Sequence, residues 1–479
     1  MGIDWWVMKT TQSSGTSPDH QTVAGTFEFK TNGKANAIGF TEQQLSPHAG
    51  SALFWGWLHR LDWRKTLAAA LPHPLPLSNH HLLPLEKALA FIHGLLCDAR
   101  KLTHVTELRR DPLVAELLGI TRVASQSVLT RCFQGCTSAG DKLRCFRPLW
   151  HWCLHRLPSR KEGYTLDLDS PRLLHKDGQQ EGVKGGYTKQ GIKPGLHPLL
   201  AVLAEVRLVA QLWLRPGYAS CGSNVTAFFL DLWDNLPGHI RLQGVRADAG
   251  FCLPERLDLW GQLKLPCVVV AQLSHPIPTL IKGHLTWTAT DVPGTEVARI
   301  EYQAMSWPHP RRLVLLRHRV SDDEERGGKR LLDVPGYRFQ ALVTSLPQNA
   351  YPPLAGWRYY NGQADGENVI KELQAGFALP TLCLEKFWAS EAALSLASLT
   401  DNLIVLFERH LGWQQKVTLQ NLRFWLFVTA GVLSHPAGKT TVKLAVPPRE
   451  RDWWRCLWEK ILASFPNCNA VENRPAFTG

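Results

Sequence analysis

Two predicted strands that each end in an aspartate constrain the fold of this chain most strongly. In GYTLDLDS, apolar residues alternate with Thr165, Asp167 and Asp169, which is the period of a β-strand with an exposed polar face. In IRLQGVRADAGF a second strand ends at Asp248, and LKLPCVVVAQL follows as a short, wholly apolar third strand. Helical patterns flank these strands, so the sequence predicts an α/β fold with Asp169 and Asp248 at neighbouring strand ends.

A third group of acids lies in YYNGQADGENVIKEL, at the start of a predicted helix. We interpret Asp365 as the N-cap, Gly366 as the residue that lets the chain come close to the site, and Glu372 as solvated. Glu367, in the first turn, is expected to project toward the two aspartates. Three such carboxylates can hold two divalent metal ions, and hard oxygen ligands suit Mg²⁺ or Mn²⁺. Acids in these places are also commonly solvated or capping residues, so spacing alone leaves both interpretations open.

The chain has 479 residues, too many for one simple core. The longest apolar run, HPLLAVLAEVRLVAQLWL, is interrupted by Glu205 and Arg207, so we interpret it as a buried helix from His197 and expect no membrane span. The patterns divide the chain into an N-terminal arm with one short strand, a helical region, the first part of an α/β core, an antiparallel β insertion, the second part of the core with the Glu367 helix, and a C-terminal helical and basic region. The corresponding ranges are 1–45, 46–160, 161–273, 274–348, 349–412 and 413–479.

Composition adds a preference for a polyanionic partner. The net charge is +12, from 53 basic and 41 acidic residues, and phosphates favour Lys and Arg through counterion release. No secretory signal opens the chain, and the 11 cysteines follow no repeated spacing, which indicates free thiols in a reducing cytoplasm. A zinc site is not favoured either, because no standard knuckle has the spacing of Cys132, Cys136, Cys145, Cys153 and His155.

The segment GVLSHPAGKTT is similar to a phosphate-binding loop only at first sight. Six residues separate Gly431 from Gly438 where four are required, and no strand leads into the segment. A basic hairpin carrying Lys439 and Lys443 is the better interpretation.

A helix-turn-helix-like pattern lies in DPLVAELLGITRVASQSVLTRCF. One helix ends at Gly119 and a second begins near Ser125, which places Ser125, Gln126, Thr130 and Arg131 where they can face DNA. An ordinary helical hairpin fits the same pattern.

Two further segments can contact DNA phosphates. GGYTKQGIKPG reads as a Gly-rich basic loop, and its DNA-contacting candidates are Lys184, Tyr187, Lys189, Lys193 and His197. RRLVLLRHR, at residues 311–319, is an alternating strand with basic ends. The alternatives are a solvated loop and an exposed strand face.

Four motifs in order, YTLDLDS, QEGVKGGYTKQGIKPGLHPLLAVLAE, VRADAGF and YYNGQADGENVIKEL, resemble those of DDE transposases of bacterial insertion sequences. The resemblance is closest to the insertion-sequence family numbered thirteen-eighty, in the group whose last catalytic motif is Tyr-x-x-Arg-x-x-x-Glu, and it runs from about Thr26 to about Pro466. It implies an RNase H-like mixed-sheet core interrupted by the β insertion, with an N-terminal helical DNA-binding region.

The resemblance also implies roles for individual residues. Asp169, Asp248 and Glu367 match the catalytic triad that holds two Mg²⁺, for which Mn²⁺ can substitute, and Asp167 is the neighbour held in reserve. Tyr360 matches the family tyrosine.

Gln363 stands where the family has an arginine expected to contact phosphate near the cut; glutamine lacks the charge and the bidentate fork. Lys371 lies four residues after Glu367, where it can reach the DNA backbone or pair with Glu367.

The implied function is binding of terminal inverted repeats followed by Mg-dependent strand cleavage and strand transfer in cut-and-paste transposition. The implied partner is double-stranded DNA, both repeat and target, with a homodimer on the DNA ends, in the cytoplasm of a bacterium and associated with the nucleoid. The alternative is a catalytically impaired end-binding protein or repressor, which the substitution at Gln363 favours.

Overall fold

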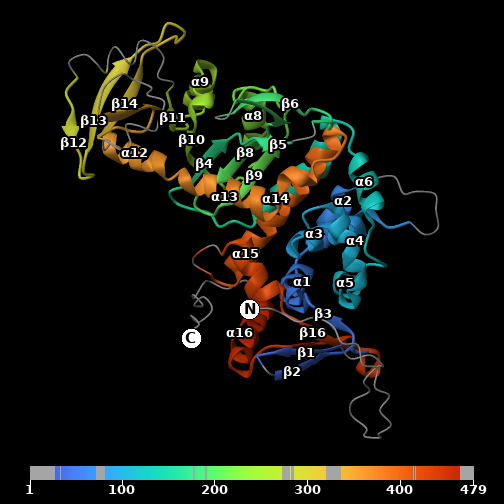
Figure 1. Ribbon diagram of the computed structural model, residues 1–479. Coiled ribbons are helices and arrows are strands. Elements are labelled where there is room, and N and C mark those ends of the chain that lie inside the picture. Colours follow the sequence, from blue (N-terminus) through green and yellow to red (C-terminus); the bar gives the residue numbers. More distant parts are fainter. Residues whose placement is uncertain are drawn as a thin grey trace, which may run out of the picture.

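The computed structural model describes residues 27–32, 34–71, 81–175, 178–188, 191–271, 281, 285–319, 336–413, 415 and 417–463. Figure 1 shows a central sheet with an antiparallel extension on one side and a group of helices from the N-terminal half on the other. The fold is mixed α/β, as the sequence predicts.

The central sheet has nine strands in the order β12-β13-β14-β15-β11-β10-β4-β8-β9. Its middle consists of the parallel strands β4 (Tyr164–Asp169), β10 (Leu242–Ala247) and β11 (Cys267–Val270). β8 (Leu199–Leu203) pairs antiparallel with β4, and β9 (Leu208–Trp213) pairs antiparallel with β8. The two aspartate-bearing strands of the sequence are therefore neighbours, with their ends at the same edge.

The predicted β insertion continues this sheet. β12 (Thr288–Ala289), β13 (Thr295–Tyr302), β14 (Arg311–Arg319) and β15 (Tyr337–Thr344) pair antiparallel in sequence order. β15 also pairs antiparallel with β11, so the added strands extend the core sheet sideways. The charged segment SDDEERGGKR lies outside the described residues.

The buried helix expected from His197 is wrong, since this apolar run is the β8–β9 hairpin. Glu205 and Arg207, which interrupt the run, lie in the turn, and Arg207 has a positive φ of 54°. Glu205 accepts the Thr165 backbone N–H at 2.9 and 3.1 Å from its two oxygens. A long apolar run fits a buried helix or two buried strands equally well, and the polar pair marks a reversal of the chain.

Two further expectations need correction. β4 is buried on both faces, since Thr165 and Asp167 are each 2% exposed, so its polar face does not meet solvent. The Gly-rich basic segment is not a loop but a hairpin of β6 (Lys184–Thr188) and β7 (Gly191–Leu196), extended by β5 (Leu173–Leu174).

The helix-turn-helix-like segment has the predicted helix boundaries. α5 (Pro112–Leu118) ends at Gly119, which has a φ of 57°, and α6 (Gln126–Gln134) follows Ser125. The other helices of this region are α1 (Ala52–His59), α2 (Trp63–Ala70), α3 (Pro84–Leu96), α4 (Leu102–Glu107) and α7 (Ala139–His155).

The remaining elements lie at the two ends of the chain and along the sheet. β1 (Phe27–Thr31) and β2 (Lys34–Ile38) form a hairpin where we expected one strand, and the predicted basic hairpin is β16 (Gly431–Ser434) and β17 (Thr441–Leu444), joined by β3 (Leu45–Ser46). The other helices are α8 (Val225–Asn235), α9 (Pro254–Gln262), α12 (Pro353–Asn361), α13 (Ala364–Gly376), α14 (Phe387–His410), α15 (Leu419–Leu422), a π-helix (Arg423–Phe427) and α16 (Arg451–Leu462).

Helix α14 covers the edge strand β9. By length and composition it is the one helix of the described part that passes as a membrane span, but its apolar window is entirely buried in the protein. Its Asn402 accepts from the Val209 N–H (2.9 Å) and donates to the Val209 carbonyl (2.7 Å). Side chains of α14 thus satisfy the backbone groups that an edge strand leaves unpaired.

A buried ion pair reinforces the same contact. Glu391 of α14 accepts the Leu214 N–H and pairs with Lys142 of α7, each at 3.1 Å. The Lys142 ammonium also lies 4.1 Å from the ring centroid of Trp213. The pair joins the N-terminal helices, α14 and the end of β9 in one contact.

Replacing Glu391 with alanine is expected to lower the free energy of unfolding by about 3–5 kcal/mol, because it leaves Lys142 buried without its counter-charge. The melting temperature measures this loss. Glu385→Ala, which removes an exposed carboxylate just before the same helix, is the control and should change little. Equal melting temperatures for the two variants would contradict the role of the pair; Lys142→Met combined with Glu391→Leu should recover much of the loss.

Candidate active site

The ends of β4 and β10 bring Asp169 and Asp248 together. Leu168 pairs with Ala247 in the parallel register, so the two aspartates leave the sheet at the same height. Helix α13, which carries Glu367 in its first turn, contacts both β4 and β8. Three carboxylates from distant parts of the sequence therefore face one site at the sheet edge.

Electrostatics shows that these carboxylates act on one another. The pKa of Asp169 is raised to about 7, first by burial and then by the negative charges of Asp248, Glu367 and Asp167. Burial and the charge of Asp248 also raise the pKa of the Tyr360 hydroxyl. The site is a concentration of negative charge, and a cation would relieve it.

Each carboxylate is engaged elsewhere as the side chains stand. Asp169 accepts the N–H of Ser170 (2.5 Å), Asp248 accepts the Tyr360 hydroxyl (3.1 Å), and Glu367 lies 3.8 Å from the Lys371 ammonium. In the described ranges, no three His, Cys, Asp or Glu side chains converge as a ready-made metal site. The donor set fits a hard divalent cation, but the carboxylates must turn inward to share one.

A buried ion pair joins the same two strands two residues before Asp169 and Asp248. Arg246 of β10 donates to both Asp167 oxygens, at 2.6 and 2.9 Å, and both side chains are almost fully buried. Arg246 also donates to the Tyr359 carbonyl at 2.7 Å. Asp167 is thus a structural partner of Arg246, which removes it from the metal-binding candidates.

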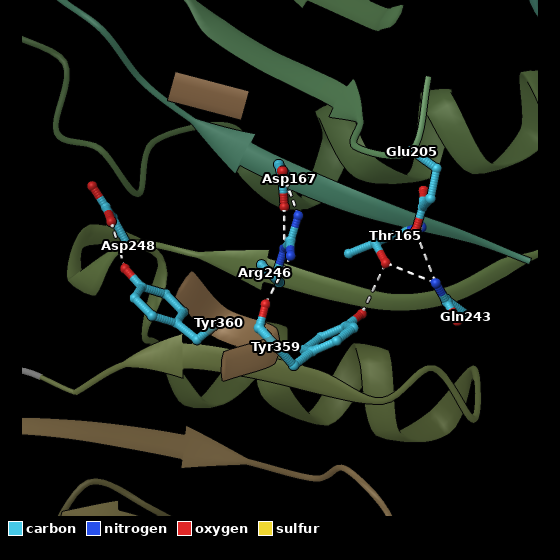
Figure 2. A network of polar contacts seen from close by, with 8 residues as sticks. All are labelled: Thr165, Asp167, Glu205, Gln243, Arg246, Asp248, Tyr359 and Tyr360. Carbon is cyan, nitrogen blue, oxygen red and sulfur yellow. Dashed lines mark hydrogen bonds and ion pairs between the residues drawn. The ribbon is translucent and has the colours of Figure 1, made fainter. Parts of the chain in front are cut away.

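Two tyrosines of α12 lie on opposite sides of this pair (Figure 2). Tyr360 points to Asp248, and the Tyr359 hydroxyl donates to Thr165 Oγ1 at 3.2 Å. Gln243 donates to Thr165 Oγ1 (2.9 Å) as well as to Glu205. This network docks α12 on the strands and so sets the position of Tyr360.

Two glycines allow the chain to approach this closely. A Cβ on Gly366 would lie 2.8 Å from an Asp167 carboxylate oxygen, and one on Gly362 would clash with the Arg246 guanidinium. The expected role of Gly366 is confirmed. Asp365 is not the N-cap, because α13 begins at Ala364.

Glu372 is not merely solvated. Its carboxylate accepts the Leu419 N–H at 2.6 Å and so caps the start of α15.

The family described as "Transposase DDE domain group 1" matches residues 30–464. The chain belongs to this family. Among solved structures, it is similar to a piggyBac transposase in a synaptic complex with hairpin DNA, with a TM-score of 0.39 and 14% identity over 72% of this chain and 71% of that one. No match was found among curated proteins.

Some predicted DNA contacts of this transposase lie on the surface. Gln126 and Arg131 of α6 are exposed, and Ser125 and Thr130 are half-buried beside them; Lys184 and Lys193 are exposed on the β6–β7 hairpin. Lys189 and the side chain of Tyr187 lie outside the described residues.

Two residues that were predicted to contact DNA are buried, which contradicts a direct contact. His197 is 1% exposed, and its ring nitrogens face the carbonyls of Ala219 (2.7 Å) and Ser170 (2.9 Å), so it supports the segment after Asp169. Gln363 is 4% exposed, and its side-chain oxygen has no hydrogen-bond partner among the described residues. A side chain this deeply buried does not reach a phosphate at the surface.

The structure is compatible with both interpretations of Lys371, a contact to the DNA backbone and an ion pair with Glu367. Lys371 forms the i,i+4 pair with Glu367 at 3.8 Å, but it is 70% exposed and the pair is therefore weak.

The positioning residues that sequence analysis missed are Arg246, Tyr359 and Glu205. The sequence contains a hint of the role of Arg246, because Arg246 precedes Asp248 by two residues, as Asp167 precedes Asp169. Only the strand register shows that Arg246 and Asp167 pair.

The raised pKa of Asp169 predicts a pH dependence of stability in the absence of divalent ions. The folded protein keeps a proton on Asp169 up to about pH 7, whereas the ordinary carboxyl value is 3.8. This protonation contributes to the free energy of unfolding. The contribution is fully present below pH 3.8 and is lost as the pH rises through about 7. Asp169→Asn should remove that loss.

Melting temperatures measured from pH 5 to pH 8 in EDTA check this prediction. The advantage of Asp169→Asn over the unsubstituted protein should grow with pH. Asp234→Asn, at an exposed site on α8, should give a curve parallel to that of the unsubstituted protein. If the curve for Asp169→Asn is also parallel to that of the unsubstituted protein, the raised pKa of Asp169 is contradicted.

Proposed function

We propose that this protein is the transposase of an insertion sequence, with Asp169, Asp248 and Glu367 as its catalytic carboxylates. The observation that carries the proposal is the meeting of these three residues at one sheet edge, with mutual charge repulsion, in a chain of the DDE transposase family. The strand order β11-β10-β4-β8-β9 supports the interpretation of the core as RNase H-like. The motif order supports placement in the insertion-sequence family numbered thirteen-eighty.

The three carboxylates would hold two Mg²⁺, or Mn²⁺ in their place. Bound there, such ions would supply Lewis-acid activation of the attacking water or DNA 3′-OH and charge stabilisation of the leaving 3′ oxygen. The residues of this chain set the geometry for that chemistry. The Arg246–Asp167 pair holds β4 and β10 in register, and the Tyr360 hydroxyl orients Asp248.

DNA recognition is proposed for two surfaces besides the three carboxylates. The helical region 46–160, through α6, and the β6–β7 hairpin supply exposed cations and polar groups that suit the terminal inverted repeats and the target DNA. A homodimer that pairs two transposon ends completes the proposal.

A catalytically impaired end-binding protein is the second candidate. Gln363 favours it, because this residue is uncharged and buried where the motif has arginine. If the protein is active, the cation at this position is dispensable in this chain.

Cleavage of a supercoiled plasmid carrying the element's ends, in the presence of Mg²⁺, tests the main proposal. The unsubstituted protein should nick at the ends, and Asp248→Asn should reduce the rate by at least about a hundredfold, since it removes a metal-binding charge. Asp234→Asn is the matched control and should cut normally. End-specific nicking that survives in Asp248→Asn, or its absence with the intact protein, would sink the catalytic assignment.

Gln363→Arg separates the two candidates. In an active transposase this change should give no gain in cleavage and a lower melting temperature, because it places a charge at a buried position. Plasmid nicking and end-binding affinity are measured together. A large gain in cleavage at unchanged binding would establish the impaired-catalyst alternative.

A further inference from the structure

A groove of about 1000 Å³ lies beside α13. Its walls are α13, α15 with the following π-helix, the β8–β9 turn at Arg207, and the segment at Asp98 and Arg100 that follows α3. Its volume is at the upper end of the range typical of ligand sites. We call it the α13–α15 groove; both helices are labelled in Figure 1.

The groove opens next to the candidate active site. Asn368, which directly follows Glu367, lines it, and so does Lys371. Lys371 is also the residue whose ammonium lies 3.8 Å from Glu367. The groove wall therefore begins within one helical turn, about 5.4 Å along the axis, of Glu367.

The groove presents positive charge to solvent. Asp98 is paired with Arg423 (2.9 Å) and Arg100 (3.3 Å), and Glu372 is engaged at the start of α15, so both acids in the wall already have partners. Arg100 and Lys371 remain 57% and 70% exposed. Exposed cations along such a groove suit a phosphate chain.

An aromatic side chain stands exposed in the same groove. Phe424 belongs to the π-helix and is 76% exposed, whereas the preceding Arg423 is buried and donates to the Leu95 and Leu96 carbonyls. The anchored arginine and the wide turn hold Phe424 outward. π-Helical turns are rare and are frequent at functional sites.

We propose that the α13–α15 groove binds a single strand of DNA, with Phe424 stacking on an unpaired base and Lys371 and Arg100 contacting phosphates. Cations interleaved with an exposed aromatic ring are the features that bind single strands without sequence preference. An aromatic side chain stacks on an unpaired base without having to unstack a duplex, which favours a single strand over intact double helix. The inference rests on the proposed function, because it gives a path to a strand that passes Glu367.

The probe is a single-stranded oligodeoxythymidylate carrying one 2-aminopurine, whose fluorescence falls when it stacks on an aromatic ring. The full-length protein should bind it and quench the signal. Phe424→Ala should weaken binding by about five- to a hundredfold and abolish the quenching, whereas Phe424→Trp should retain both. Phe40→Ala removes another exposed phenylalanine (63% exposed) and should behave as the unsubstituted protein.

The phosphate contacts have their own readout. Lys371→Gln should reduce the slope of log affinity against log salt concentration by about 0.7, the share of one phosphate contact on a single strand. Unchanged affinity and quenching in Phe424→Ala would overturn the proposal. A loss of self-association in Phe424→Ala, seen by size-exclusion chromatography without any change in DNA binding, would also overturn it, because the groove would then seat a second copy of the chain.

Failure of the groove and failure of the catalytic proposal are distinguishable. If Phe424→Ala behaves as the unsubstituted protein while Asp248→Asn still abolishes nicking, the groove inference fails and the transposase proposal stands. If no variant affects nicking but Phe424→Ala loses the quenching, the groove binds a strand and the catalytic assignment fails.

Discussion

The buried ion pair between Asp167 and Arg246 is the interaction on which the site depends. Both charges are out of water, which is tolerable only because Arg246 makes two short bonds to Asp167 and a third to the Tyr359 carbonyl. The pair joins β4 to β10 two residues before Asp169 and Asp248, so it fixes the relative height of the two strand-end carboxylates. Its third bond ties the same strands to α12, which carries Tyr360.

The sequence predicts the strands and helices of the site better than it predicts which side chains pair with one another. The alternating strands and the acids at their ends were visible in the residues, and so were the antiparallel strands after β11. The run after His197 was misread, because its composition suits a buried helix and a buried hairpin alike. Partnerships such as Arg246 with Asp167, or Glu372 with the Leu419 N–H, join residues distant in sequence, and only the three-dimensional register determines them.

The charge balance around the carboxylates gives Gln363 a physical meaning. Arg246 lies two residues before Asp248, but its charge is matched by that of Asp167 and both side chains are buried. Lys371 is exposed and only loosely paired with Glu367. An arginine at position 363 would add a cation at a buried position, where desolvation opposes it. We propose that Lys371, at the surface of α13, supplies the positive charge for a DNA phosphate instead.

Helix α13 links the two surfaces that matter. Its first turn carries Glu367 toward the strand ends, and its later turns form the wall of the α13–α15 groove. Gly366 fixes how closely this helix lies against Asp167, and Glu372 fixes its other end to α15. These contacts hold the helix in place relative to both the strand ends and α15. A strand seated in the groove would thus lie along the same helix that carries Glu367.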